Sequence, residues 1–163
     1  MIKKSVFIAL FSLFNVFIGW AQTAHYNVVP LPKSIQYANA GDFILNSQTT
    51  IAYPKGNKAL HQNAILLAQY IQQSTGLQLK VVTKANDNSI TLRQNLTSNH
   101  TEAYQLKVTK MGVFIDGASD AGCFYGIQTL RKALPVGRVQ QVTLPSVEVE
   151  DYPRFSYRGA HLD

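Results

Sequence analysis

The chain has 163 residues, a formal net charge of +6 and a hydrophobic content of 46%, which is enough for one domain with its own core. A complete (β/α)₈ (TIM) barrel needs about 200 residues or more by itself, so these residues do not encode one. The lysines and arginines are scattered and form no basic run with interleaved aromatic residues. We therefore expect solvated surface rather than a nucleic-acid groove.

Residues 1–21 have the pattern of a secretory signal peptide, with a short basic start followed by the mostly apolar run 6–20. A membrane anchor is the rival interpretation, but it needs about 20 apolar residues. Ser12 and Asn15 interrupt the run. We expect cleavage after Ala21, a secreted or periplasmic protein, and no membrane association after cleavage.

Short apolar runs predict strands in the first half of the chain. Prolines make residues 28–33 an extended lead-in or covering strand. The β-rich runs 43–45 and 50–53 predict a hairpin. Residues 77–82 and 89–93 alternate like strands around an asparagine-rich turn.

A first helix is predicted between these two pairs of strands, because the hydrophobic period changes at about Lys58. Gly76 stands where a C-terminal cap belongs. The apolar residues that share one face of this helix are Leu60, Ala64, Leu67, Ala68 and Ile71.

The second half predicts a hairpin of residues 102–109 and 113–116, a second helix at 119–134, and extended pieces at 140–144 and 147–150. These elements do not alternate as βαβ units. The simplest arrangement is an α+β fold with one mostly antiparallel or mixed sheet and both helices on one of its faces.

The helix at 119–134 has marked ends. Ser119 can cap it by accepting a hydrogen bond from the amide of the second or third helical residue, and Pro135 prevents its continuation. Gly122 and Gly126 each cost about 1 kcal/mol inside a helix, which indicates close packing against a sheet or a neighbouring domain. The residues predicted to form its apolar stripe are Phe124, Ile127, Leu130 and Leu134.

Motifs for metals, cofactors and nucleotides are absent from the sequence. The four histidines are far apart, and there is no His-Glu-x-x-His, Cys-x-x-Cys or phosphate-binding glycine loop. The single Cys123 lies in an apolar helix and is interpreted as a small buried hydrophobe. Glu148 and Glu150 are either a carboxylate pair for sugar hydrolysis or a polar strand face before a linker. The second is favoured, because nothing nearby indicates a pocket that would raise one pKa.

The stretch G-x-F-Y-G-x-Q-T-L at residues 122–130, followed by Leu134-Pro135, resembles the last helix of a small α/β domain in glycoside hydrolase family 20. This domain, of the chitobiase/β-hexosaminidase domain 2 type, precedes the catalytic barrel of the β-N-acetylhexosaminidases. Residues 29–33 resemble the opening of that domain, and residues 151–163 resemble the entry into the first barrel strand.

The resemblance implies a domain organisation: a signal peptide at 1–21, the accessory α/β domain at 22–150, and a linker with the first strand of a truncated barrel at 151–163. It also implies that Arg158 binds hydroxyls of the terminal N-acetylhexosamine, which suits the rigid fork of a guanidinium. Asp163 would have a supporting role in the same pocket. The missing catalytic barrel would pack against the helix at 119–134.

The implied activity is hydrolysis of terminal β-linked GlcNAc or GalNAc with retention, and it needs no cofactor. The acetamido oxygen of the substrate is the nucleophile, an Asp orients it, and a Glu is the general acid. The sequence lacks that Asp-Glu pair, so we expect an inactive N-terminal fragment of a secreted enzyme. A secreted non-catalytic, carbohydrate-associated or scaffold module is the alternative.

Overall fold

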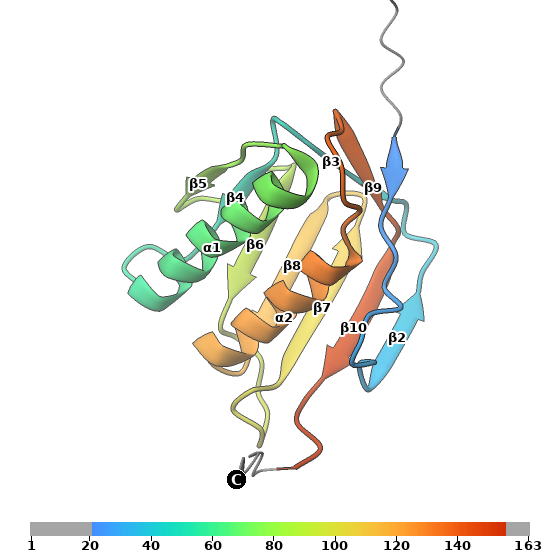
Figure 1. Ribbon diagram of the computed structural model, residues 1–163. Coiled ribbons are helices and arrows are strands. Elements are labelled where there is room, and N and C mark those ends of the chain that lie inside the picture. The colour runs from blue at the N-terminus through green and yellow to red at the C-terminus, as the bar shows by residue number, and fades with distance from the viewer. Residues whose placement is uncertain (1–20, 156–163) are drawn as a thin grey trace, which may run out of the picture.

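The computed structural model describes residues 21–155 as an α+β fold with two mixed-direction sheets and two helices (Figure 1). Residues 1–20 of the predicted signal peptide (1–21) and residues 156–163 of the predicted linker and first barrel strand (151–163) lie outside the described residues. The predicted α+β class is confirmed, but the prediction of a single sheet is wrong.

The larger sheet has seven strands, and half of its pairings are parallel. In spatial order the strands are β2 (Ser34–Tyr37), β10 (Val147–Asp151), β7 (Tyr104–Thr109), β8 (Gly112–Gly117), β6 (Ser89–Arg93), β4 (Thr50–Ala52) and β5 (Lys80–Val82). The first four of these strands pair antiparallel with one another, whereas β8, β6, β4 and β5 pair parallel. The predicted hairpin in the second half is confirmed, because β7 and β8 pair directly.

The smaller sheet has three strands in the order β1 (Gln22–Thr23), β9 (Gln141–Leu144) and β3 (Phe43–Asn46). The predicted hairpin of residues 43–45 with 50–53 is therefore wrong. A turn does follow β3, with the Thr49 amide donating to the Asn46 carbonyl. It carries the chain from the small sheet into the large one, where β4 pairs with β5 and β6.

One βαβ unit is present, contrary to the prediction. Strand β4, helix α1 (Lys58–Thr75) and strand β5 follow one another, and the two strands are parallel neighbours. Because β4 lies between β5 and β6, the strands at 80–82 and 89–93 are not paired across their turn. A crossover helix permits this parallel pairing, which two adjacent strand-like runs in a sequence do not reveal.

Helices α1 and α2 (Asp120–Ala133) pack against each other and cover one face of the large sheet, as predicted (Figure 1). The Asn57 side chain caps α1 by accepting from the Leu60 amide at 2.9 Å, and Gly76 ends it with a φ of 80°. The positive φ explains why glycine occupies the C-terminal cap. The core between the helices and the sheet is made of buried aliphatic side chains such as Leu67, Ile90, Leu106, Ile115 and Leu130.

The buried face of α2 differs in one position from the predicted stripe. Ile127, Leu130 and Leu134 are buried, but Phe124 is only half-buried and packs edge-on against Tyr125. Cys123 occupies the sheet-facing position instead. The stripe is rotated because the two glycines, rather than the large aromatic residue, face the sheet.

Candidate functional site

The N-terminus of α2 is tied to the loop before β7. The Gly122 amide donates to Ser119 Oγ at 3.3 Å, and this hydroxyl donates to the Thr101 carbonyl at 2.6 Å. Ser119 is thus the predicted N-terminal cap. The same hydroxyl that satisfies a free helix amide also fixes the helix against its neighbour.

Two glycines allow α2 to lie very close to the sheet, which confirms the predicted close packing. A Cβ atom on Gly122 would lie 2.2 Å from the Ala103 carbonyl oxygen, and one on Gly126 would lie 2.6 Å from Ile115 Cγ2. Both distances are far below a normal contact. The glycines therefore serve the packing inside this domain.

A pocket of about 300 Å³ opens between α2, the start of β7 and the chain that follows β10. Within it, Tyr104 Oη and Thr129 Oγ1 form a hydrogen bond of 2.6 Å. Burial raises the pKa of Tyr104 to about 12, so the phenol is neutral at physiological pH. Gln128 Nε2 is buried and has no hydrogen-bond partner among the described residues.

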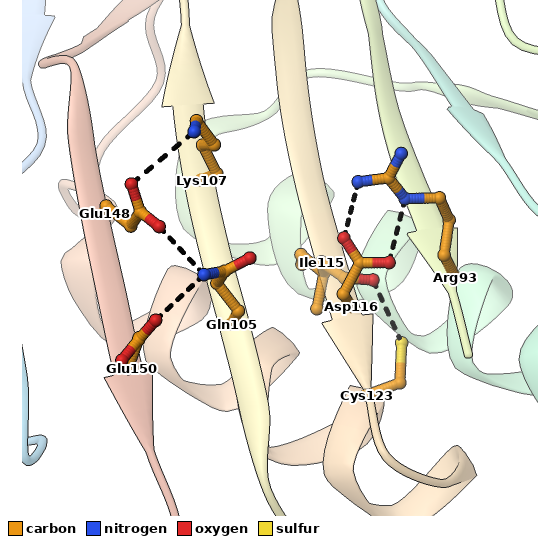
Figure 2. Close-up of polar contacts among 8 residues, drawn as sticks. All are labelled: Arg93, Gln105, Lys107, Ile115, Asp116, Cys123, Glu148 and Glu150. Atoms are coloured by element: carbon orange, nitrogen blue, oxygen red, sulfur yellow. Dashed lines mark hydrogen bonds and ion pairs between the residues drawn. The ribbon is translucent and has the colours of Figure 1, made fainter. Parts of the chain in front are cut away.

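The two glutamates of β10 lie on the face of the large sheet that is opposite to the two described helices (Figure 2). Figure 2 shows both carboxylates pointing to one amide: Gln105 Nε2 donates to Glu148 at 2.8 Å and to Glu150 at 2.9 Å. Lys107 Nζ lies 3.5 Å from Glu148. These side chains are partly or fully exposed. The arrangement supports the polar strand face rather than a catalytic carboxylate pair.

Arg93 and Asp116 form an ion pair that was not predicted from the sequence; the Arg93 side chain is 40% exposed and that of Asp116 is 12% exposed. Arg93 Nε donates to Asp116 Oδ1 at 2.9 Å, and a second guanidinium nitrogen donates to Oδ2 (Figure 2). The residues lie opposite each other because β6 and β8 are parallel neighbours. The two residues are 23 positions apart in the sequence. Their pairing could be predicted only from the register of β6 and β8, which the sequence does not reveal.

Cys123 has the surroundings of a packing residue. Its thiol is buried and points to the Ile115 carbonyl at 3.9 Å (Figure 2). Burial raises the pKa of the Cys123 thiol to about 12, and the nearby Asp116 charge acts in the same direction. The reactive thiolate is therefore not formed at neutral pH.

The substrate-contact residues predicted from the sequence, Arg158 and Asp163, lie outside the described residues. Within residues 21–155, no group of three or more His, Cys, Asp or Glu side chains is placed to hold a metal ion. Neither helix of this range is long and apolar enough to cross a membrane.

Two mixed sheets, the larger covered on one face by two helices, define an α+β domain. The glutamate pair of β10 in this domain is solvent-accessible and shares the Gln105 amide. Residues 25–152 match the glycosyl hydrolase family 20, domain 2, so the chain belongs to this family. The resemblance seen in the α2 motif is thereby confirmed. Homologues of this region include the accessory domain 2 of β-hexosaminidases.

Individual relatives agree with this assignment. A β-hexosaminidase of Porphyromonas gingivalis is 34% identical over 146 residues, which cover 84% of this chain and 18% of the relative. A mutant Streptomyces plicatus β-hexosaminidase, solved in complex with its product GlcNAc, superposes with a TM-score of 0.70 at 26% identity, over 82% of this chain and 27% of that one. A lacto-N-biosidase of Bifidobacterium bifidum is 32% identical over 108 residues, or 64% of this chain and 9% of the relative.

The chain thus spans only between 9% and 27% of the length of these relatives. Their names also differ in activity, because a β-hexosaminidase and a lacto-N-biosidase both contain a region similar to this domain. Sequence similarity to this domain therefore does not indicate which substrate a relative prefers.

Proposed function

We propose that this domain is the N-terminal accessory domain of a secreted β-N-acetylhexosaminidase that removes terminal β-linked GlcNAc or GalNAc from glycans. The observation that carries the proposal is the family match over residues 25–152 on a fold with the matching arrangement of sheets and helices. The relatives named β-hexosaminidase, one of them bound to GlcNAc, support the substrate class.

In this proposal, the hydrolysis of the glycosidic bond is carried out by a barrel domain that is encoded after residue 163. There, the acetamido oxygen of the substrate attacks the anomeric carbon, an Asp orients it, and a Glu protonates the leaving oxygen. The described residues offer no equivalent, since Glu148 and Glu150 share an amide on an exposed sheet face. Arg158 and Asp163 are proposed to contact the terminal sugar at the first barrel strand.

The barrel is proposed to pack against the outer surface of α2. Two features support this side of the domain. The pocket beside α2 is lined by Tyr152 and Pro153, which directly follow the last described strand, β10. The partly exposed Tyr125 of α2 lines the same pocket and offers an aromatic surface.

Secretion is part of the proposal and is tested separately. Cleavage after Ala21 would leave Gln22 at the new terminus, and this residue begins β1, which pairs with β9. The cut would therefore leave every described strand intact. The mass of the mature protein from its native source checks it, and a mass that includes residues 1–21 would contradict it.

The activity test compares the purified 163-residue chain with the longer product of the same reading frame, using nitrophenyl β-GlcNAc. We expect no enzyme-dependent nitrophenol from the short chain and clear release from the long one. An Arg158→Ala variant of the long product should lose most of its activity at low substrate concentration. Turnover by the short chain would contradict the proposal. A reading frame that ends at residue 163 would favour the non-catalytic module.

A further inference from the structure

Three segments meet around the ring of Tyr152, the residue directly after β10. The His100 ring stacks on it with a centroid distance of 4.5 Å and an angle of 13° between the planes. Lys33 Nζ lies 4.4 Å from the centre of the same ring. These two contacts come from the lead-in before β2 and from the loop before β7, which are far apart in the sequence.

The lysine contact rests on a segment that is itself fixed. Lys33 directly precedes β2, and its backbone amide donates to Asp151 Oδ1 at 3.2 Å. Farther back in the lead-in, the Val29 carbonyl accepts a hydrogen bond from Lys132 Nζ of α2. The lead-in is therefore attached both to the helix layer and to the end of β10.

The histidine contact is also held in place. The His100 amide donates to Ser98 Oγ at 3.1 Å, and the His100 carbonyl accepts from the Ala103 amide at 3.0 Å. The Ala103 carbonyl in turn accepts from the Ala118 amide at 2.9 Å, next to the start of α2. The loop that presents His100 is thus closed on itself and tied to the end of β8.

We propose that Lys33, His100 and Tyr152 form an exit clamp, which holds the first residues after β10 against the domain and sets the direction in which the chain leaves it. The lead-in connects Tyr152 to α2, because Lys33 contacts the Tyr152 ring and Val29 accepts a hydrogen bond from Lys132 of α2. Phe155, three residues after Tyr152, is 72% exposed and lies outside this set of contacts. The clamp requires no barrel domain, and so this inference stands apart from the proposed function.

Trypsin cleavage after Arg154 reports the clamp in the 163-residue chain. A protease binds several extended residues on each side of the cut, so Tyr152 must leave the clamp before Arg154 is cleaved. Cleavage after Arg138, in the exposed segment between α2 and β9, is an internal control in the same digest. Mass spectrometry of a time course gives both rates.

We expect Tyr152→Ala to speed cleavage after Arg154 about tenfold, which corresponds to about 1.4 kcal/mol, and to leave the Arg138 rate unchanged. His100→Ala should speed the same cut about threefold. Tyr152→Phe is the matched control: it keeps the ring and should keep the wild-type rate.

Three results would overturn the clamp. One is an unchanged Arg154 rate in Tyr152→Ala. Another is an equal rise at Arg154 and Arg138, which would assign the ring to the stability of the whole domain. The third is a Tyr152→Phe variant cleaved as fast as Tyr152→Ala, because that would assign the effect to the hydroxyl group.

Discussion

Replacing Gly122 by Ala tests the close approach of α2 to the sheet. The added Cβ would lie 2.2 Å from the Ala103 carbonyl oxygen and 3.2 Å from its carbonyl carbon. These are backbone atoms of the residue that leads into β7, so they cannot rotate away as the end of a side chain would. The helix or the start of the strand must move.

The expected magnitude is a balance of two effects. Overpacking in a well-packed region costs about 1–3 kcal/mol or more, and this overlap belongs at the upper end. Alanine regains at most about 1 kcal/mol of helix propensity over glycine. Gly122→Ala should therefore destabilise the domain by about 2 kcal/mol, or lower its Tm by about 4–8 °C for a domain of this size.

The neighbouring positions supply the comparison. Gly126→Ala should cost less, about 1 kcal/mol, because its Cβ meets the side chains of Ile115 at 2.6 Å and Tyr104 at 3.1 Å rather than backbone. Ala121→Gly, on the exposed side of the same turn, measures propensity without overlap. Urea denaturation and thermal circular dichroism give the three values. A Gly122→Ala variant as stable as the wild type would refute the packing argument.

Three further predictions concern α2 and its surroundings. Ser119→Ala removes the N-terminal cap and should lower the free energy of unfolding by about 1 kcal/mol in urea denaturation; an unchanged value would show that water replaces the hydroxyl. Tyr104→Phe leaves the Thr129 hydroxyl without its partner and should cost about 1–2 kcal/mol, whereas Thr129→Val in the same background should cost little more. Burial raises the pKa values of Cys123, from 9.0, and Tyr104, from 10.0, to about 12 each, so the unfolded state releases these protons first. These two groups should therefore leave the free energy of unfolding unaffected between about pH 7 and pH 9 and lower it above about pH 9, less steeply in Cys123→Ala; a flat profile between pH 9 and pH 10.5 would contradict this.

The helices and their ends were predictable because their signals are local. Gly76 and Ser119 act on amides and carbonyls within a few residues, and the spacing of Ile127 and Leu130 defines one face of a helix. The two glycines inside α2 lower its helix propensity, and this cost in free energy likewise predicts that another part of the chain packs closely against the helix. The β7–β8 hairpin was predictable for the same reason, since its two strands are joined by a tight turn.

The partners of the remaining strands were decided only by the tertiary structure. Strands β3 and β4 are adjacent in the sequence but belong to different sheets, and β5 reaches β4 through a helix. A short apolar run has the same pattern whichever strand it joins, because pairing depends on which faces the helices and the second sheet can bury. Contacts that need the register, such as Arg93 with Asp116 and Tyr152 with His100, follow from that choice and carry no signal in the sequence alone.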